Sequence, residues 1–149
     1  MIKKLIYIML PVAGFAQGSA EQVNWEIHQE WVNDSIVELT LNAEIAEGWH
    51  MYGSNVSPDI GPIPTTFYWD DSIADRLQDS LWYSEGIEGY DDAFMADLSY
   101  YEDSASFKQT VVIPDDLDKT WLEIEFMVCG DGVCLPPDVV KIPLYFKKD

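Results

Sequence analysis

The chain has two cysteines, Cys129 and Cys134, and only four residues separate them. A disulfide between them closes a ring of about six residues, to which the chain-entropy model assigns roughly 2 kcal/mol, against nearer 5 for a hundred-residue loop. A pair placed for stability alone gains more from wide separation. The spacing therefore favours a redox-active dithiol, with a structural disulfide, common in small exported domains, as the alternative.

The sequence around the cysteines, Cys-Gly-Asp-Gly-Val-Cys-Leu-Pro-Pro, predicts a tight hairpin end. Cys129 ends a strand-like segment and Cys134 begins the return. Opposed positions of this kind satisfy the usual disulfide Cα separation of about 5.5 Å. The two glycines accept backbone angles that other residues resist, so the bond can open and close without a large rearrangement. Pro136 and Pro137 stiffen the exit.

The charge near the thiols is negative. Asp131 lies between the cysteines, and no Lys, Arg or His is beside them in the sequence. A carboxylate disfavours a neighbouring thiolate, so we expect a sluggish nucleophile when the pair is reduced. Such a pair is suited to being attacked by the activated cysteine of a partner protein.

Other chemistries find little support among the residues. Two cysteines with only His28 and His50 do not have zinc-site spacing, and His28 lies in an alternating segment typical of a surface strand. The sequence has neither a nucleophile-elbow pattern for a serine hydrolase nor a glycine-rich phosphate loop. We therefore expect neither a metal nor a cofactor.

The N-terminus has the pattern of a secretory signal peptide, a short basic segment followed by an apolar run too short to span a bilayer comfortably. Gly14 and Ala16 offer small residues for cleavage. They predict a signal over residues 1–16, with cleavage as late as Ala20 as the alternative. Residues 17–149 then form a single domain of usual length, which we expect to be exported and soluble.

The chain is strongly acidic. Its formal charge of −19 becomes −21 once residues 1–16, which hold Lys3 and Lys4 and no acid, are removed, leaving 6 basic residues against 27 acidic ones. Such a surface repels nucleic acid and anionic lipid. No apolar stretch after the signal is long enough to cross a membrane. The aromatic and β-branched content is high enough to fill a core, which argues against disorder.

Apolar and polar residues alternate along most of the chain, and helical periodicity is sustained almost nowhere. The least regular part is residues 70–97, where we expect at most one or two helical turns within residues 73–81. Seven or more strands with short turns predict an all-β, immunoglobulin-like antiparallel β-sandwich, with the cysteines at the top of the final hairpin. The expected strands are residues 23–27, 37–45, 49–52, 65–69, 98–101, 105–113, 122–128 and 139–146.

The motif Cys-x4-Cys-Leu-Pro-Pro after an alternating strand resembles the N-terminal periplasmic domain of the DsbD thiol:disulfide interchange protein, and so do the segments Gly48–Tyr52 and Asp91–Phe94. The resemblance covers most of the mature chain. It implies an immunoglobulin-like periplasmic domain whose cysteine pair relays electrons between thioredoxin-fold proteins, as a protein-disulfide reductase that depends on partners. Since the sequence ends before any membrane or thioredoxin-like segment, the expected electron donor is a separate membrane protein.

Matching the family motif position by position implies roles for individual residues. Cys134 is the implied thiol that forms the mixed disulfide with a partner, and Cys129 is the thiol that resolves it. Phe94 is the implied cap over the closed site. Asp92 is the implied acid beside the site, and Tyr52 the implied aromatic near the cysteine pair.

Two departures from the family pattern leave a second function open. The gap between the cysteines is one residue shorter than in the best-known members, and Met95 stands where a second cap aromatic often is. The alternative is an immunoglobulin-like binding module with an inert disulfide. Such a module would hold a carbohydrate through its loop aromatics, or a protein through its acidic face.

Overall fold

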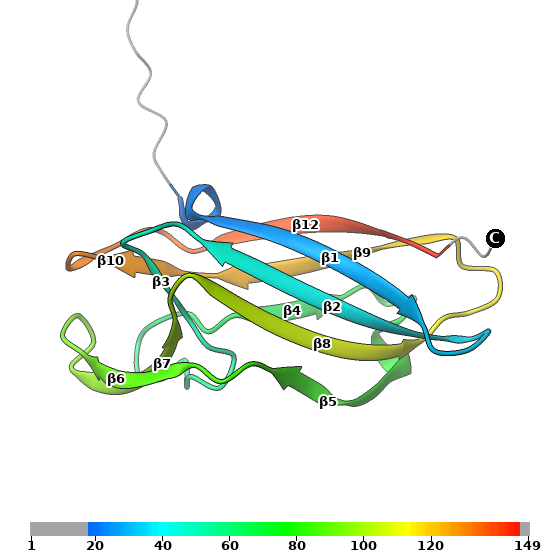
Figure 1. Cartoon of the computed structure of the whole chain (residues 1–149), viewed down its shortest axis with the longest axis horizontal. Coiled ribbons are helices and arrows are strands. Elements are labelled where there is room, and N and C mark those ends of the chain that lie inside the picture. The colour runs from blue at the N-terminus through cyan, green and yellow to red at the C-terminus, as the bar shows by residue number, and fades with distance from the viewer. Residues whose placement is uncertain (1–17, 147–149) are drawn as a thin grey trace, which may run out of the picture.

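The computed structural model describes residues 18–146, which are built almost entirely from β-strands (Figure 1). The signal peptide expected over residues 1–16 lies outside the described residues. Within the described part, the helical elements are two 3₁₀ turns, η1 (Ser19–Gln22) and η2 (Ala74–Arg76). No helix there is long and apolar enough to span a membrane. The strands are β1 (Val23–Trp31), β2 (Ile36–Ile45), β3 (His50–Tyr52), β4 (Thr66–Trp69), β5 (Leu77–Tyr83), β6 (Ile87–Asp91), β7 (Ala96–Tyr101), β8 (Ser104–Val112), β9 (Lys119–Phe126), β10 (Val128–Gly130), β11 (Val133–Cys134) and β12 (Asp138–Tyr145).

The strands form three antiparallel sheets, and two of these stack as a sandwich. One layer has the strand order β1-β2-β8-β5 and the other has the order β12-β9-β4. The third sheet, in the order β11-β10-β3-β7-β6, lies at one end of the molecule, at the left of Figure 1. This arrangement confirms the all-β antiparallel sandwich that the sequence predicts.

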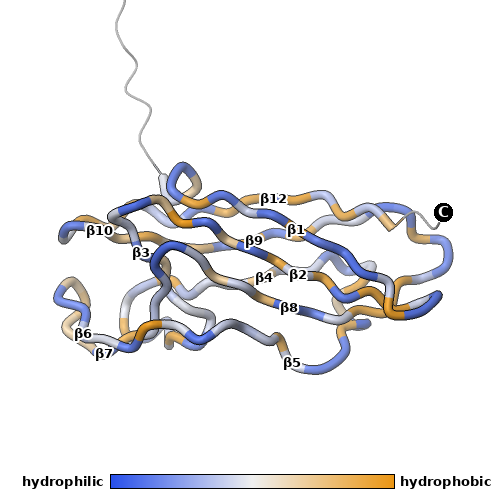
Figure 2. Tube along the Cα trace, viewed as in Figure 1, coloured by the Kyte–Doolittle hydropathy of each residue, from blue (hydrophilic) through white to orange (hydrophobic). Residues whose placement is uncertain are grey.

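The space between the two layers is filled by one large apolar core. Strand β2 contributes Leu39 and Leu41, and β9 contributes Leu122 and Ile124, because every second residue of each strand faces inward. All four side chains are fully buried. The residues between them stay partly exposed, so apolar and polar residues alternate along these strands in Figure 2. The alternation in the sequence therefore reports the two sides of each layer.

Strand β9 leads directly into the segment that carries the first cysteine, but it changes sheets on the way. The sequence predicts one strand over residues 122–128, whereas the ladder to β12 ends at Phe126 and a ladder to β3 begins at Val128. Met127 lies between these two ladders. Every residue from Phe126 to Gly130 is buried, because side chains pack against both faces of the five-stranded sheet.

Residues 70–97 contain more regular structure than the sequence indicates. The helical turns expected within residues 73–81 reduce to η2, and strands β5 and β6 occupy much of the segment. Both are edge strands with mostly exposed side chains, so no buried periodicity marks them in the sequence. A bulge between Gln78 and Trp82 interrupts β5 further.

Candidate functional site

The two cysteines form a disulfide at one edge of the five-stranded sheet. Cys129 on β10 lies directly opposite Cys134 on β11, with 4.0 Å between the Cα atoms and 2.01 Å between the sulfurs. Cys129 is buried, with 3% of its surface exposed, whereas Cys134 is partly exposed. An incoming nucleophile therefore has better access to the Cys134 side of the bond.

A two-residue turn brings the cysteines together. Gly130 pairs with Val133, which leaves Asp131 and Gly132 as the two central residues of the turn. Both have positive φ, 48° at Asp131 and 73° at Gly132, as a type I′ turn requires, and Asp-Gly is a sequence that favours this turn. Asp131 is exposed at the tip, so water screens the charge that the sequence places between the cysteines.

The five-stranded sheet has a different set of side chains on each of its two faces. Met51, Val128 and Tyr101 belong to the main core. The residues that alternate with them belong to a second hydrophobic cluster, which we call the cysteine cluster. The disulfide therefore lies outside the main core of the sandwich. The buried members of the cysteine cluster are Tyr52, Val56, Leu98, Met127 and Cys129, and Ile63, Phe94, Ala96, Tyr100 and Cys134 pack against them.

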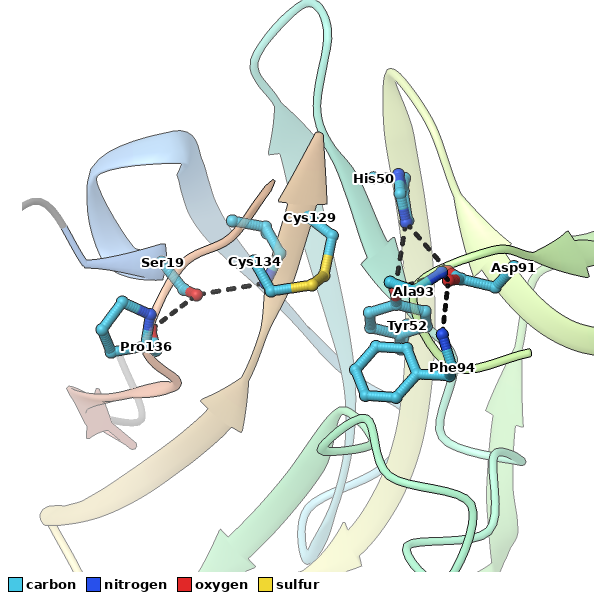
Figure 3. Close-up of a disulfide and its surroundings, with 10 residues drawn as sticks. Ser19, His50, Tyr52, Asp91, Ala93, Phe94, Cys129, Cys134 and Pro136 are labelled. Carbon is cyan, nitrogen blue, oxygen red and sulfur yellow. Dashed lines mark hydrogen bonds and ion pairs between the residues drawn. A yellow bond between two sulfur atoms is a disulfide. The ribbon is translucent and has the colours of Figure 1, made fainter. Parts of the chain in front are cut away.

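Phe94 is half-buried against the cysteine cluster (Figure 3). Its ring meets the ring of Tyr52 edge to face, with 5.7 Å between the centroids. The ring of Phe94 also packs against Gly61, so closely that a Cβ atom added to Gly61 would be 2.6 Å from the ring. Phe94 is thus held between strand β3 and the proline-rich loop, while the neighbouring Met95 is 77% exposed.

A buried acid organises the polar side of the cluster. Asp91, the last residue of β6, accepts a 2.6 Å hydrogen bond from the Tyr52 hydroxyl on Oδ2. The backbone N–H groups of Ala93 and Phe94 donate to its Oδ1 at 2.8 and 3.2 Å. Burial by itself raises the pKa of Asp91, but the bonds from Tyr52 and the two amides, together with nearby His50, outweigh it and hold that pKa below its ordinary value.

Tyr52 is the neutral donor in this arrangement. The pKa of the Tyr52 hydroxyl is well above its ordinary value. Burial is the largest cause, and the hydrogen bond to Asp91 and the charge of that carboxylate raise the pKa further. The family resemblance implies that Tyr52 lies near the cysteines. The structure puts it in the same buried cluster as Cys129, with its hydroxyl on the polar side.

The acid that makes these bonds is Asp91 and not Asp92, which the sequence analysis singled out. Asp92 is exposed and lines the same hollow as Cys129, so it lies at the rim of the site. A local signal for Asp91 exists in the sequence, since an Asp can accept hydrogen bonds from the backbone amides two and three residues on and so fix a turn. In this chain those amides belong to Ala93 and Phe94.

His50 is a site residue that the sequence analysis missed. No His is near the cysteines in the sequence, yet His50 lies directly opposite Cys129 on the neighbouring strand β3. The two residues are far apart in the chain, and the pairing of β3 with β10 brings them together. His28, by contrast, is exposed on β1, as the sequence predicts.

An open hollow of about 310 Å³ lies beside the disulfide on the side of the Asp91 network. Its rim carries three carboxylates and one imidazole, and none of its lining residues is a Lys or an Arg. Residues of strands β6 and β10 line the hollow, and Cys129 is among them. Its lining residues are His50, Tyr90, Asp91, Asp92, Ala93, Tyr100, Glu102, Cys129 and Gly132.

The first described residues tie the cysteine hairpin to the N-terminal end of the domain (Figure 3). Ser19 is fully buried, and its hydroxyl donates to the carbonyl of Pro136 at 2.8 Å and accepts from the N–H of Val128 at 3.1 Å. The next amide, of Ala20, donates to Asp138 Oδ2 at 2.7 Å. Turn η1 therefore holds both sides of the hairpin that carries the disulfide.

The fold and the disulfide together define an immunoglobulin-like domain with a cysteine pair that fits thiol:disulfide interchange. The chain belongs to the family "Thiol:disulfide interchange protein DsbD, N-terminal", whose sequence profile matches residues 17–144. This finding confirms the resemblance seen in the sequence motifs. No curated protein sequence shows a significant match to the chain.

Two solved structures from Neisseria meningitidis are similar to this fold. One is the DsbD N-terminal domain in the reduced form, with a TM-score of 0.54 and 21% identity, covering 82% of this chain and 86% of that chain. The other is a complex between the DsbD N-terminal and the PilB N-terminal domains, with a TM-score of 0.56 and 20% identity, covering 84% of each chain. These similarities confirm the expected immunoglobulin-like fold.

Proposed function

We propose that this protein is an exported thiol:disulfide interchange domain that relays electrons between thioredoxin-fold proteins through Cys129 and Cys134. The observation that carries the proposal is the placement of the bond, with Cys134 partly exposed at the edge of a sheet and Cys129 buried behind it. Membership of the DsbD N-terminal family supports it. In this proposal the domain acts as a protein-disulfide reductase that uses the cysteine pair alone.

The exchange takes place in two balanced steps. In the first, a thiolate of the reduced donor attacks Cys134 Sγ, and the electron pair of the broken bond leaves on Cys129 Sγ, which takes up a proton. In the second, the donor's other thiol loses a proton and attacks the donor's own sulfur in the mixed disulfide, which releases Cys134 as a thiolate that is then protonated. The donor is oxidised to a disulfide, and the pair on this chain gains two electrons and two protons.

The proposed partners are thioredoxin-fold proteins, with a separate membrane protein as the donor. The similar complex from Neisseria meningitidis joins the DsbD N-terminal domain to the PilB N-terminal domain, which supports docking of another domain on this fold. The signal-peptide pattern and the family support export to the periplasm. The acidic charge of the chain argues against nucleic acid as a partner.

Phe94, Tyr52 and Asp92 complete the proposed site. Phe94 is the proposed cap, since it packs against the cluster that holds the disulfide and lies next to an exposed residue of the same loop. The ring of Tyr52 supports the ring of Phe94 through an edge-to-face contact, with 5.7 Å between the centroids. Asp92 is exposed at the rim, so a docking partner would contact it before reaching the disulfide.

A redox titration of the purified domain tests the proposal. A relay should have a reduction potential in the thioredoxin to isomerase range, roughly −270 to −180 mV, whereas an inert structural bond should lie below about −300 mV. We expect a reduced thioredoxin-fold protein to open the bond in the folded domain, as measured by alkylation and intact mass. A bond that opens only after denaturation would leave a binding module with a structural disulfide.

Single replacements of the cysteines test their roles. Cys129→Ser should trap a mixed disulfide with a thioredoxin-fold partner through Cys134, because the resolving thiol is missing. Cys134→Ser is the matched control and should trap far less, since Cys129 is buried. Trapping only in the control would reverse the roles, and trapping in neither variant would argue for a structural bond.

A further inference from the structure

Three side chains form a row across the edge of the five-stranded sheet. His50 on β3 lies opposite Cys129 on β10, and Cys129 lies opposite Cys134 on β11. Side chains directly opposite each other in antiparallel strands lie on the same face of the sheet, with Cβ atoms about 4.5–5.5 Å apart. His50 and Cys129 also border the same hollow. His50 is therefore the residue directly opposite Cys129 on the neighbouring strand, and its imidazole borders the same hollow as the buried cysteine.

The hydrogen bonds around His50 assign its tautomer. The Tyr52 hydroxyl has one hydrogen, which it donates to Asp91 Oδ2 at 2.6 Å. The 3.2 Å contact between Tyr52 Oη and His50 Nε2 then requires an N–H on the imidazole, and the 3.5 Å contact of Nε2 with Asp91 requires the same. In the neutral ring, Nε2 carries the proton and Nδ1 has the free lone pair. No described residue in 18–146 hydrogen-bonds to Nδ1.

The hollow beside Cys129 is lined by carboxylates and by no Lys or Arg. Asp91 is the carboxylate closest to His50, and the rings of Tyr52 and Tyr100 pack around it at centroid distances of 5.3 and 5.1 Å. Such negative surroundings favour the neutral thiol over a released thiolate, so the sulfur needs a proton when the bond breaks. The titratable groups that face His50 come from all the elements around the hollow. They are Tyr52 on β3, Tyr90 and Asp91 on β6, Asp92 in the turn after β6, Tyr100 on β7, Glu102 in the turn after β7, and Cys129 on β10.

We propose that His50 is the proton-exchange group of Cys129, held in position by Asp91 and Tyr52. The proposal rests on the relay proposed above. When a donor thiolate attacks Cys134 and the S–S bond breaks, the electron pair leaves on Cys129 Sγ, and the imidazolium of His50 gives its Nδ1 proton to that sulfur. The ring is left neutral with its proton on Nε2. When the pair reduces an acceptor that is held in a mixed disulfide with Cys134, Nδ1 takes the proton back from the Cys129 thiol. The thiolate so formed attacks Cys134 Sγ, the Cys129–Cys134 bond forms again, and the acceptor's sulfur leaves as a thiolate.

A purely structural role for His50 is the competing explanation, because its ring also packs between Tyr52 and Tyr100. The two explanations differ in pH dependence. A packed ring has the same effect at every pH, whereas a proton donor works only while the imidazole is charged. Histidine side chains in general change charge between about pH 5 and 8, so a proton-donor role predicts that the rate of disulfide opening per reductant thiolate falls as pH rises across this range.

The test measures the opening of the disulfide in the mature domain by dithiothreitol between pH 5 and 8.5, with each rate divided by the concentration of reductant thiolate. We expect the normalised rate of the wild type to fall at least about tenfold across this range, at the low end of the effect of a positioned acid. His50→Gln keeps a side-chain N–H for Tyr52 and Asp91 but cannot exchange a proton. Its normalised rate should be flat and should equal the high-pH rate of the wild type.

The exposed histidine offers a matched control. His28→Gln removes the other imidazole of the chain, on the remote strand β1, and should keep the full pH dependence of the wild type. A second measurement needs no substitution: long-range ¹H–¹⁵N spectra should show His50 in the Nε2–H tautomer at high pH.

The outcomes separate the two proposals. If the wild-type bond does not open in the folded domain, the relay fails and the role of His50 fails with it. If the bond opens but its normalised rate is independent of pH, or if His50→Gln keeps the pH dependence, the relay stands and the role of His50 is overturned. An Nδ1–H tautomer in the wild type would overturn it as well, even if the variant did not fold.

Discussion

The two faces of the five-stranded sheet carry different kinds of side chain. On one face, Met51, Val128 and Tyr101 join the main core, which is apolar and closed between two layers of long strands. On the other face, a disulfide lies in a cluster with aromatic rings, next to a buried carboxylate and an imidazole, and Phe94 packs against this cluster. We therefore expect substitutions on the first face to affect mainly the free energy of unfolding, and substitutions on the second to affect mainly the reactivity of the cysteines.

The largest effect should come from the main core. Phe107 is fully buried and contacts the rings of Trp25, Phe67 and Tyr101. Phe107→Ala should lower the free energy of unfolding by about 3–5 kcal/mol, as measured by urea denaturation of the oxidised domain. The reduction potential of the cysteine pair should not change in the folded variant. A changed potential would mean that the two faces are not independent.

Phe94→Ala examines the other face. Because Phe94 is only half-buried, we expect a loss of about 2 kcal/mol or less in the free energy of unfolding. The reduced cysteines should react several-fold faster with iodoacetamide, since their cover is gone. The exposed neighbour supplies the control, and Met95→Ala should change neither quantity. An unchanged alkylation rate in folded Phe94→Ala would remove the cap from the mechanism, and a loss of about 3–5 kcal/mol would make Phe94 a core residue.

Asp91→Asn should change the free energy of unfolding by an amount that depends on pH, and this tests the buried acid on the face that carries the disulfide. The folded state holds the pKa of Asp91 below its ordinary value of 3.8, so the charged carboxylate stabilises the fold above that pH and its contribution is lost as pH falls through the lower folded pKa. We expect the variant to lose about 1–2 kcal/mol at neutral pH and progressively less below about pH 4, in urea denaturation series. Asp92→Asn, at the exposed rim, should cost less than about 0.5 kcal/mol at every pH. Equal losses in the two variants would contradict the assignment of Asp91 as the buried acid.

The smallest effect is expected at the tip of the hairpin. Asp131→Asn removes the charge between the cysteines but keeps a residue that tolerates positive φ before Gly132, so stability should change by less than about 0.5 kcal/mol. Alkylation of the reduced pair should accelerate only slightly, because water surrounds this carboxylate, and the difference should disappear in high salt. A large acceleration that persists in high salt would show that Asp131 acts on the sulfurs directly.

The sequence predicts the strands that have one buried face and fails on those that have none. Residues such as Leu39 and Leu122 alternate with polar neighbours, and this pattern alone is enough to locate β2 and β9 in the chain. Strands β5 and β6 are exposed over most of their length, so their sequence carries no period of two. The type of turn between the cysteines is likewise encoded locally, by Asp131 and Gly132.

The site itself is only half visible in the sequence. The cysteines and Phe94 stand out because their residue types are rare in such a segment. His50 and Asp91 do not, since histidines and acids are common on surfaces, and their importance arises from the pairing of distant strands. A histidine two residues before a buried tyrosine on one strand faces the same side as that tyrosine, and this is the signal that could have placed His50 in the cluster.

The buried Ser19 has a consequence for the order in which the chain folds. Its bonds to Val128 and Pro136 span 109 and 117 residues, whereas the cysteines are 5 apart. A chain made from its N-terminus presents Ser19 first and its partners last, and contacts of such separation form slowly. The ring of Cys129 and Cys134 can close as soon as its own turn forms. The disulfide can therefore form before Ser19 anchors the hairpin.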